Sequence, residues 1–227
     1  MTSLSDLYAI VRSQTQTQPD ELPDVVINVH LQQAFERTIA AENNWPFYEQ
    51  TWDLTQPAGS FDAVLPGDVV QSQIITLVGP EGHRLTMMSP EAAELVYDQW
   101  VGSTGAREYS IWGNRITFWP QIPYAVDRAY KLRGYRRPRA WASILPAEGP
   151  DCDERFHLPM SNYAIAMAYA QQEDEVLETV YMTRWQHDVE MAAKAIMEPV
   201  HMRPLTMGPH HRAMRPGSPF VVNTGGL

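Results

Sequence analysis

The chain contains little cysteine and little lysine. Cys152 is the single cysteine among 227 residues, which excludes an internal disulfide and a cysteine-ligated zinc site and suits a reducing compartment. Of the 17 cationic side chains, 15 are arginine and two are lysine. Guanidinium groups pair with carboxylates through two hydrogen bonds, so this bias favours protein interfaces. A GC-rich genome or chance explains the bias equally well.

Long apolar runs are missing as well. No run approaches the ~18 residues of a membrane-spanning helix. The first residues, MTSLSDLYAI, have no basic region ahead of an apolar one. We therefore expect a soluble protein that is not exported by a signal peptide.

Recognisable catalytic and metal-binding motifs are also lacking. The sequence has no Gly-rich phosphate loop, no HExxH and no GxSxG. The acidic clusters 151–154 and 173–175 lack the spacing and central glycine of a calcium loop, and the helix dipole explains acids at helix starts. We predict no enzyme, no cofactor and no metal site. A hydrolase using His157 or His187 is an alternative, but no feature selects a substrate for it.

Charge is unevenly distributed. The net charge is -10, and residues 1–198 alone carry 14 basic against 27 acidic side chains, a balance of -13. From Glu148 to Glu198 there are 11 acids and three bases, a balance of -8. A general nucleic-acid binder needs cations to displace counterions from phosphates, so this class is disfavoured. The composition is compatible with a surface that DNA passes without sticking.

Apolar spacing predicts helices near both ends of the chain. The first has apolar residues from Leu4 to Val11 with Ser3 or Ser5 as its cap, and the second runs from Asp20 and Pro23 to about Asn43. Two more helices are predicted, one from Pro159 to Gln171 and one with an apolar stripe from Leu177 to Ile196. Neither pair is long enough to be stable alone, so we expect the two pairs to pack together.

The middle of the chain has the texture of short strands. Runs at 51–54, 73–78, 84–87 and 128–135 are separated by Pro and Gly turns, with one helix from Pro90 to Trp100. The clearest hairpin has the two-residue turn Gly113-Asn114, which pairs Trp112 with Arg115, Ile111 with Ile116 and Tyr109 with Phe118.

These patterns predict an α+β fold. A discontinuous helical bundle forms from the N- and C-terminal regions, with an inserted antiparallel β-rich domain and an extended C-terminal arm. The expected divisions are 1–44 for the first part of the bundle, 45–150 for the insertion, 151–198 for the helical hairpin that completes the bundle, and 199–227 for the arm.

The arm has an unusual composition. It holds five prolines, four glycines, three Met, three His and three Arg, with no Asp, Glu or Lys, and it includes the apolar run 219–222. Proline prevents a regular element, and ordinary disordered tails are charged and poor in apolar residues. We therefore predict that the arm lies against another chain. Its candidate contact residues are Arg203, His210, His211, Arg212, Arg215 and Phe220.

A basic run is the second candidate interface. Six of the 17 cations fall within the 12 residues 128–139, and Tyr135 and Trp141 flank them. Arginines with stacking aromatics fit single-stranded nucleic acid, but they fit an acidic neighbour equally well, and the acidic region 148–198 of an identical subunit offers one. We favour subunit contact. The candidate residues are Arg133, Arg136, Arg137, Arg139 and Trp141.

The order of these features resembles the head–tail adaptor, or neck and connector, proteins of tailed bacteriophages. A helical segment leads to Glu42-Asn43-Asn44-Trp45-Pro46-Phe47, then to Trp52 and the turn Leu65-Pro66-Gly67-Asp68. The hairpin Ile111 to Phe118, Pro120, the strand Tyr130 to Tyr135 and two closing helices with Tyr163 and Ala164 follow. The resemblance covers most of residues 1–198.

The resemblance implies a ring of identical subunits, typically 12, in the virion neck. The ring would dock on the portal protein, meet a downstream tail or nozzle protein, and extend the channel through which DNA passes without sequence-specific binding. Assembly would take place in the host cytoplasm, without a membrane. The alternative is a carbohydrate- or protein-binding tail or fibre module. That alternative requires Trp112, Trp119 and Trp141 to share one exposed face.

Overall fold

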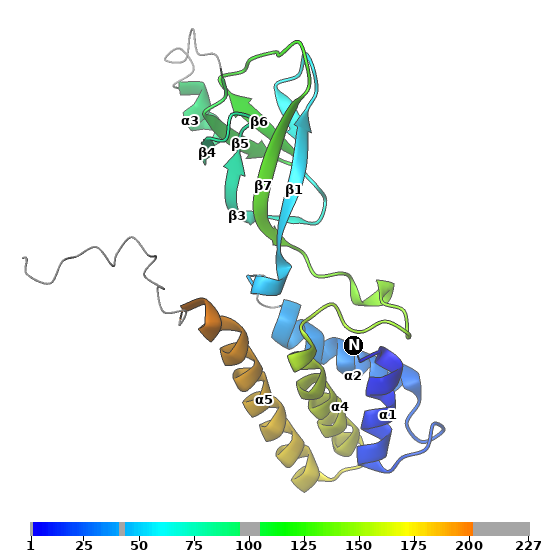
Figure 1. Ribbon diagram of the computed structural model, residues 1–227. Coiled ribbons are helices and arrows are strands. Elements are labelled where there is room, and N and C mark those ends of the chain that lie inside the picture. The colour runs from blue at the N-terminus through cyan, green and yellow to red at the C-terminus, as the bar shows by residue number, and fades with distance from the viewer. Residues whose placement is uncertain (1, 41–43, 96–104, 202–227) are drawn as a thin grey trace, which may run out of the picture.

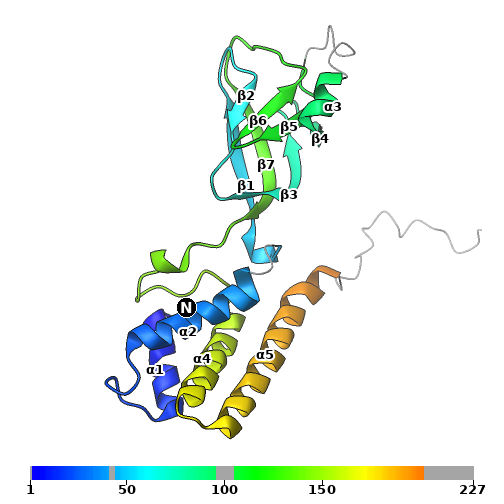
Figure 2. The same ribbon diagram turned by 180° about the vertical axis from the view of Figure 1, so that it is seen from behind.

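The computed structural model describes residues 2–40, 44–95 and 105–201 and shows an elongated α+β molecule (Figure 1). Helices gather at one end, and a seven-stranded sheet with the short helix α3 (Pro90–Leu95) forms the other. The view from behind shows the same two parts joined by a narrow junction (Figure 2). The predicted α+β class is confirmed.

The first two helices begin where their sequence signals lie. Ser3 caps α1 (Leu4–Thr15) through a capping box with Asp6, so Ser3 and not Ser5 starts this helix. Pro23 precedes α2 (Asp24–Phe35), which continues as a π-helical turn, η1 (Glu36–Ala40). Both helices bury apolar residues at helical spacing, including Leu7, Val11, Ile27 and Leu31, none of which is measurably exposed.

The helix α4 (His157–Gln171) is the central helix of this end. Ten of its 15 residues are buried, because α1 and α2 contact it on one side and α5 (Glu175–His201) on another. Ala164 and Ala168 are at most 1% exposed, and their small side chains permit this close packing. One apolar cluster joins residues from Leu4 to Tyr48 with residues from Trp141 to Ile196. The segments that precede and follow the sheet in the sequence therefore share one hydrophobic core.

The last helix ends later than the sequence predicts. α5 extends to His201, so the first three residues of the expected arm, 199–201, are helical. Proline at 199 has no amide hydrogen to donate to the carbonyl oxygen of Ala195, four residues earlier. Arg155 Nη1 donates to that oxygen instead, at 3.3 Å. This contact satisfies the carbonyl that the proline leaves free, so the helix continues through the proline.

The sheet is mixed, and the prediction of an antiparallel insertion is wrong in this respect. Its order is β1-β7-β3-β4-β5-β6-β2, and β4 pairs in parallel with β5. Parallel pairing needs a crossover connection, and α3 lies between the two strands in the chain. The strands are β1 (Glu49–Gln56), β2 (Asp62–Val64), β3 (Val69–Val78), β4 (Arg84–Met87), β5 (Glu108–Trp112), β6 (Arg115–Trp119) and β7 (Arg128–Arg136).

The predicted hairpin is confirmed in its register. β5 and β6 pair Trp112 with Arg115, Ile111 with Ile116 and Tyr109 with Phe118, around a turn in which Gly113 has a positive φ of 59°. Phe118 stacks on Tyr130 of β7 with ring centroids 4.0 Å apart, inside a second apolar cluster that belongs to the sheet. The sequence missed the three-residue strand β2. The predicted helix from Pro90 is confirmed to Leu95, and its remaining residues, 96–100, lie outside the described part of the chain.

Two neighbouring segments connect the sheet with the helices. η2 (Pro46–Tyr48) leads into β1, and residues 137–140 lead from β7 to η4 (Trp141–Ser143). β1 and β7 pair along their whole length, from Glu49–Tyr135 to Gln56–Arg128, so both segments leave the sheet at the same place (Figure 1).

Candidate functional site

Most of the basic run pairs with acids of its own chain. Arg133 pairs with Glu49, Arg136 with Asp151, and Arg139 with Glu148 at 3.0 Å. Asp151 and Glu148 belong to the acidic region 148–198, which we predicted to contact the basic run of an identical subunit. Sequence reasoning missed these pairs because no local pattern links β7 to the loop that precedes α4.

The pair between Arg136 and Asp151 lies at the junction. Nη1 and Nη2 of Arg136 each donate to one carboxylate oxygen of Asp151 at 2.7 Å, and the backbone amide of Arg139 donates to the same carboxylate at 2.7 Å. The guanidinium also lies over the ring of Tyr48, 4.8 Å from its centroid. Tyr48 in turn donates its hydroxyl to the backbone oxygen of Asp151. These contacts, which we call the junction clamp, tie β7 and η2 to the loop before α4.

The titration behaviour of the clamp agrees with its geometry. Burial raises the pKa of the Asp151 carboxyl, but the Arg136 hydrogen bonds and the Arg139 amide outweigh burial and lower the pKa below its usual value. Burial raises the pKa of the neighbouring Cys152 thiol, so this cysteine stays protonated and is a poor nucleophile.

Arg137 differs from its neighbours in the basic run. Its side chain is exposed and has no carboxylate partner among the described residues. Its backbone is held, because its amide donates to the Asp68 carbonyl at 2.6 Å and its own carbonyl accepts from Arg136 at 3.2 Å. Within the described part of the chain, Arg137 is therefore a cation without a carboxylate partner, and its backbone is fixed.

Arg137 stands at the rim of a cavity of about 510 Å³, which we call the waist cavity. Phe35 and Trp141 line it and are only 3% and 7% exposed, with ring centroids 5.4 Å apart. The cavity thus combines aromatic lining with a cation. The other lining residues are Glu36, Ala40, Val70, Pro138, Arg139 and Ala140.

The exposed aromatic face required by the carbohydrate-binding alternative is absent. Trp112 is 69% exposed, but Trp119 and Trp141 are each 7% exposed. Trp119 donates its indole N–H to Ser110 at 2.9 Å, and Trp141 donates to Asn28 at 3.0 Å. Trp141 belongs to the core of the helical end.

Six of the candidate contact residues belong to the arm. Arg203, His210, His211, Arg212, Arg215 and Phe220 all lie outside the described residues.

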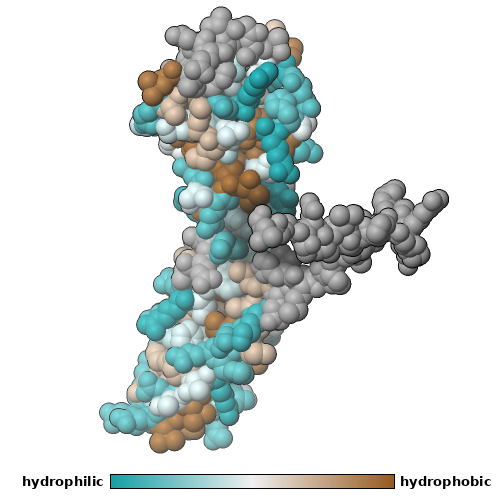
Figure 3. Space-filling model, turned by 90° about the vertical axis from the view of Figure 1, so that its left-hand side faces the viewer, coloured by the Kyte–Doolittle hydropathy of each residue, from teal (hydrophilic) through white to brown (hydrophobic). Residues whose placement is uncertain are grey.

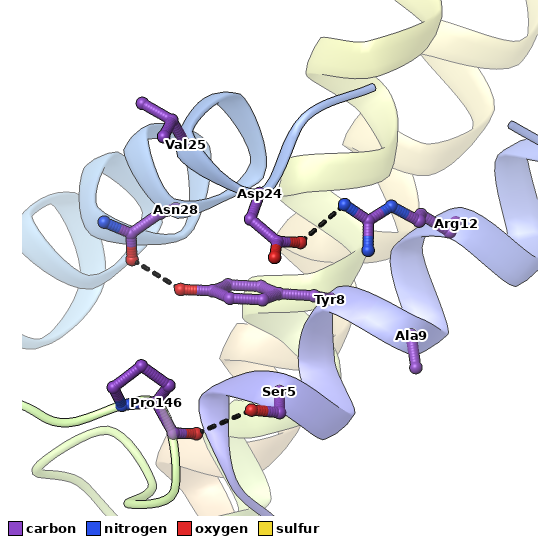
Figure 4. Close-up of a pocket in the computed structure, with 8 residues that line it drawn as sticks. All are labelled: Ser5, Tyr8, Ala9, Arg12, Asp24, Val25, Asn28 and Pro146. Carbon is purple, nitrogen blue, oxygen red and sulfur yellow. Dashed lines mark hydrogen bonds and ion pairs between the residues drawn. The ribbon is translucent and has the colours of Figure 1, made fainter. Parts of the chain in front are cut away.

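A groove between α1 and α2, which we call the α1/α2 groove, has a volume of about 390 Å³ (Figure 4). Tyr8 lies along it and donates to Asn28 Oδ1 at 2.9 Å, the same oxygen that accepts from Trp141. Arg12 bridges α1 to Asp24 of α2, and Ser5 donates to the carbonyl of Pro146 at 2.9 Å. Val25 on the groove wall is 73% exposed. The groove is a preformed concave surface with an apolar side.

The opposite side of the helical end is formed by α5. Tyr181, Trp185 and Val189 pack on the apolar cluster shared with α4, while Val176, Val180 and Met191 point away from it and are 74%, 38% and 52% exposed. We call these three residues and the exposed positions between them the outer face of α5. Figure 3 shows hydrophobic side chains at the lower end of this side of the molecule. α4 lies between α1 and α5 in both ribbon views (Figures 1 and 2), so the groove and the outer face lie on different sides.

The described ranges contain neither a metal-binding cluster nor a membrane-spanning helix. No group of three or more His, Cys, Asp or Glu is arranged to hold a metal ion there. Within those ranges, no helix combines the length and apolarity that crossing a bilayer requires.

The match of the chain to one protein family identifies its class, a phage head–tail adaptor. Residues 2–208 match the family model described as SU10 adaptor protein, and the chain belongs to this family. Membership implies a structural role in the virion, between head and tail, together with portal and tail components. No curated protein matches the chain.

Proposed function

We propose that the protein forms a closed ring, typically of 12 copies, that docks on the portal and extends the DNA channel to the tail. Residues 1–44 and 151–198 would form the body of the ring, and 45–150 would be an insertion directed to the tail or the outer rim. The residues after α5 would be an arm that orders on the portal or on a neighbouring subunit. Assembly would take place in the host cytoplasm.

The observation that supports the ring is the pair of unlike faces at the helical end. The outer face of α5 carries exposed Val176 and Val180, and the α1/α2 groove carries exposed Val25. Two different faces on different sides of one subunit make a heterologous contact, which generates a ring when the rotation closes. We therefore assign the outer face of α5 to the α1/α2 groove of the next subunit.

The charge of the chain fits a DNA channel. Residues 1–198 carry 14 basic and 27 acidic side chains, a balance of -13. Acids that remain on the inner wall of a ring repel phosphates, so DNA would pass without being held.

The experiment is to measure the mass of the protein alone and with its portal protein, for the natural chain and for Val180→Arg. The natural chain is expected to enlarge to a ring with the portal, whereas Val180→Arg is expected to stay small, because a longer, charged side chain would replace the apolar one at the centre of the contact and would lose its hydration there. The matched control is Val126→Arg, since Val126 is 68% exposed on a loop of the sheet. A natural chain that never enlarges with any head or tail component would refute the proposal.

A further inference from the structure

We propose that the waist cavity of each subunit receives Phe220 from the arm of a second copy of this chain. The inference rests on the proposed ring, and it names where the arm binds. The site is the cavity at the junction, with Phe35 and Trp141 in its lining and Arg137 at its rim.

The chemistry of the cavity suits one aromatic side chain. Phe35 and Trp141 are nearly buried, while the half-exposed Val70 and Ala40 border a space of about 510 Å³. Arg137 has no carboxylate partner among the described residues, and its backbone is pinned to Asp68 and Arg136. A guanidinium held in this way can lie over the face of an aromatic ring that enters beside it.

The arm carries one residue that fits. Phe220 is the single aromatic among residues 202–227 and is flanked by Pro219, Val221 and Val222. Aromatic anchors in pockets supply most of the binding energy of protein interfaces. The arm also complements the body in charge, because residues 202–227 hold three arginines and no acid, and the body has a balance of -13. Glu36, an exposed residue of the cavity lining, accepts a hydrogen bond from Gln32 through Oε1, and its carboxylate adds negative charge where an arginine of the arm could bind.

The arm begins in the right place to reach the cavity of the next subunit. α5 ends beside the junction, at the level where the sheet meets the helices (Figures 1 and 2). The proposed ring seats α5 on the α1/α2 groove of its neighbour. That groove and the waist cavity adjoin, because Trp141 lines the cavity and bonds to Asn28 of the groove. Phe220 lies 19 positions after His201, and at ~3.3 Å per position this length of chain spans up to about 60 Å.

A peptide titration tests the cavity itself. The probe is a fluorescent peptide of residues 214–224, MRPGSPFVVNT, and the receptor is the full chain with Phe220→Ala, so that its own arm does not compete. We expect saturable binding by anisotropy, and about 30-fold weaker binding for the Phe220→Ala peptide, the loss typical of a buried aromatic anchor. Equal binding of the two peptides, or none by the natural one, would overturn the inference.

Receptor variants locate the binding site. Ala140→Trp adds bulk to the cavity wall and should abolish binding, and Arg137→Ala should weaken it. Arg107→Ala changes another exposed arginine, the residue just before β5, and should leave binding unchanged. Circular dichroism checks that each receptor is folded. Tight binding to folded Ala140→Trp would show that the peptide binds elsewhere and would overturn the inference.

Photocrosslinking identifies the donor chain. Full chains with p-benzoylphenylalanine at position 220, mixed from light and heavy isotope cultures, are irradiated after assembly with the portal. Crosslinks between light and heavy chains at 35–40 or 137–141 are expected. Crosslinks within one chain only, or to the portal only, would overturn the inference. The portal-only result would leave the proposed adaptor function standing, and absence of a ring would count against that function instead.

Discussion

Removing the carboxylate of Asp151 tests whether the junction clamp holds the two parts of the molecule together. The Asp151 side chain is 15% exposed and accepts three hydrogen bonds of 2.7 Å, two from the Arg136 guanidinium and one from the Arg139 amide. In Asp151→Ala the Arg136 guanidinium would lose its counterion and the amide its acceptor, while the backbone bond from Tyr48 would remain.

The size of the effect follows from burial. Breaking a fully buried ion pair costs about 3–5 kcal/mol, because the remaining charge is desolvated without compensation. The Arg136 side chain is 24% exposed, so water recovers part of that loss. We expect the free energy of unfolding to fall by about 2–3 kcal/mol, which lowers the urea midpoint by about 1 M at an m-value of about 2–3 kcal/mol/M.

Urea unfolding followed by tryptophan fluorescence measures this shift. The matched control is Glu49→Ala, which breaks the Arg133–Glu49 pair between β7 and β1. That pair is more exposed, with Arg133 at 53%, and its loss should cost less than about 1 kcal/mol. If Asp151→Ala has the same midpoint as the natural chain, or if Glu49→Ala costs as much, the clamp does not stabilise the junction.

Three further changes test other parts of the fold. Burial lowers the pKa of His157, and the nearby Glu154 and Asp153 oppose this effect, so the unfolded chain binds more protons than the folded one. The free energy of unfolding should therefore fall as the pH drops below about 6.5. His157→Leu should reduce this pH dependence in urea titrations, and an unchanged pH dependence would contradict the assignment. Gly134→Ala should lower the free energy of unfolding by about 1–3 kcal/mol in the same assay, because a Cβ at this position meets backbone atoms of Gln73 and Ile74 at 3.2 Å. The control is Gly67→Ala, whose Cβ meets nothing within 4 Å, and equal urea midpoints for the two variants would refute the steric argument. Leu31→Ala in α2 should cost about 2–5 kcal/mol, because Leu31 is fully buried in the helical core, and a smaller loss would mean that the core collapses around the gap.

The sequence was most informative where local chemistry decides the structure. The Gly113-Asn114 turn determined the register of β5 and β6, and the apolar stripe from Leu177 to Ile196 predicted α5. The parallel pairing of β4 with β5 depends on residues 20 or more positions apart, so no local signal announced it. The three residues of β2 were too few to form a pattern.

The candidate interface shows the same limit. The cations of residues 128–139 were recognisable as a cluster, but which of them are free depends on tertiary contacts. Arg136 and Arg139 are engaged by Asp151 and Glu148, and Trp141 is buried, while Arg137 alone of the predicted β7-side arginines has no such carboxylate among the described residues. Neither the waist cavity nor the α1/α2 groove has a sequence signature, because each is lined by residues from distant segments.

The central position of α4 has a consequence for synthesis on the ribosome. α1 and α2 emerge more than a hundred residues before the helix against which they pack. Their apolar sides remain exposed to solvent while the strands, which lie between α2 and α4 in the sequence, are translated and fold. Packing of α1 and α2 against α4 is therefore among the last steps of folding during synthesis. A chain that terminates before α4 would expose these apolar sides and would be prone to aggregate unless chaperones bind it.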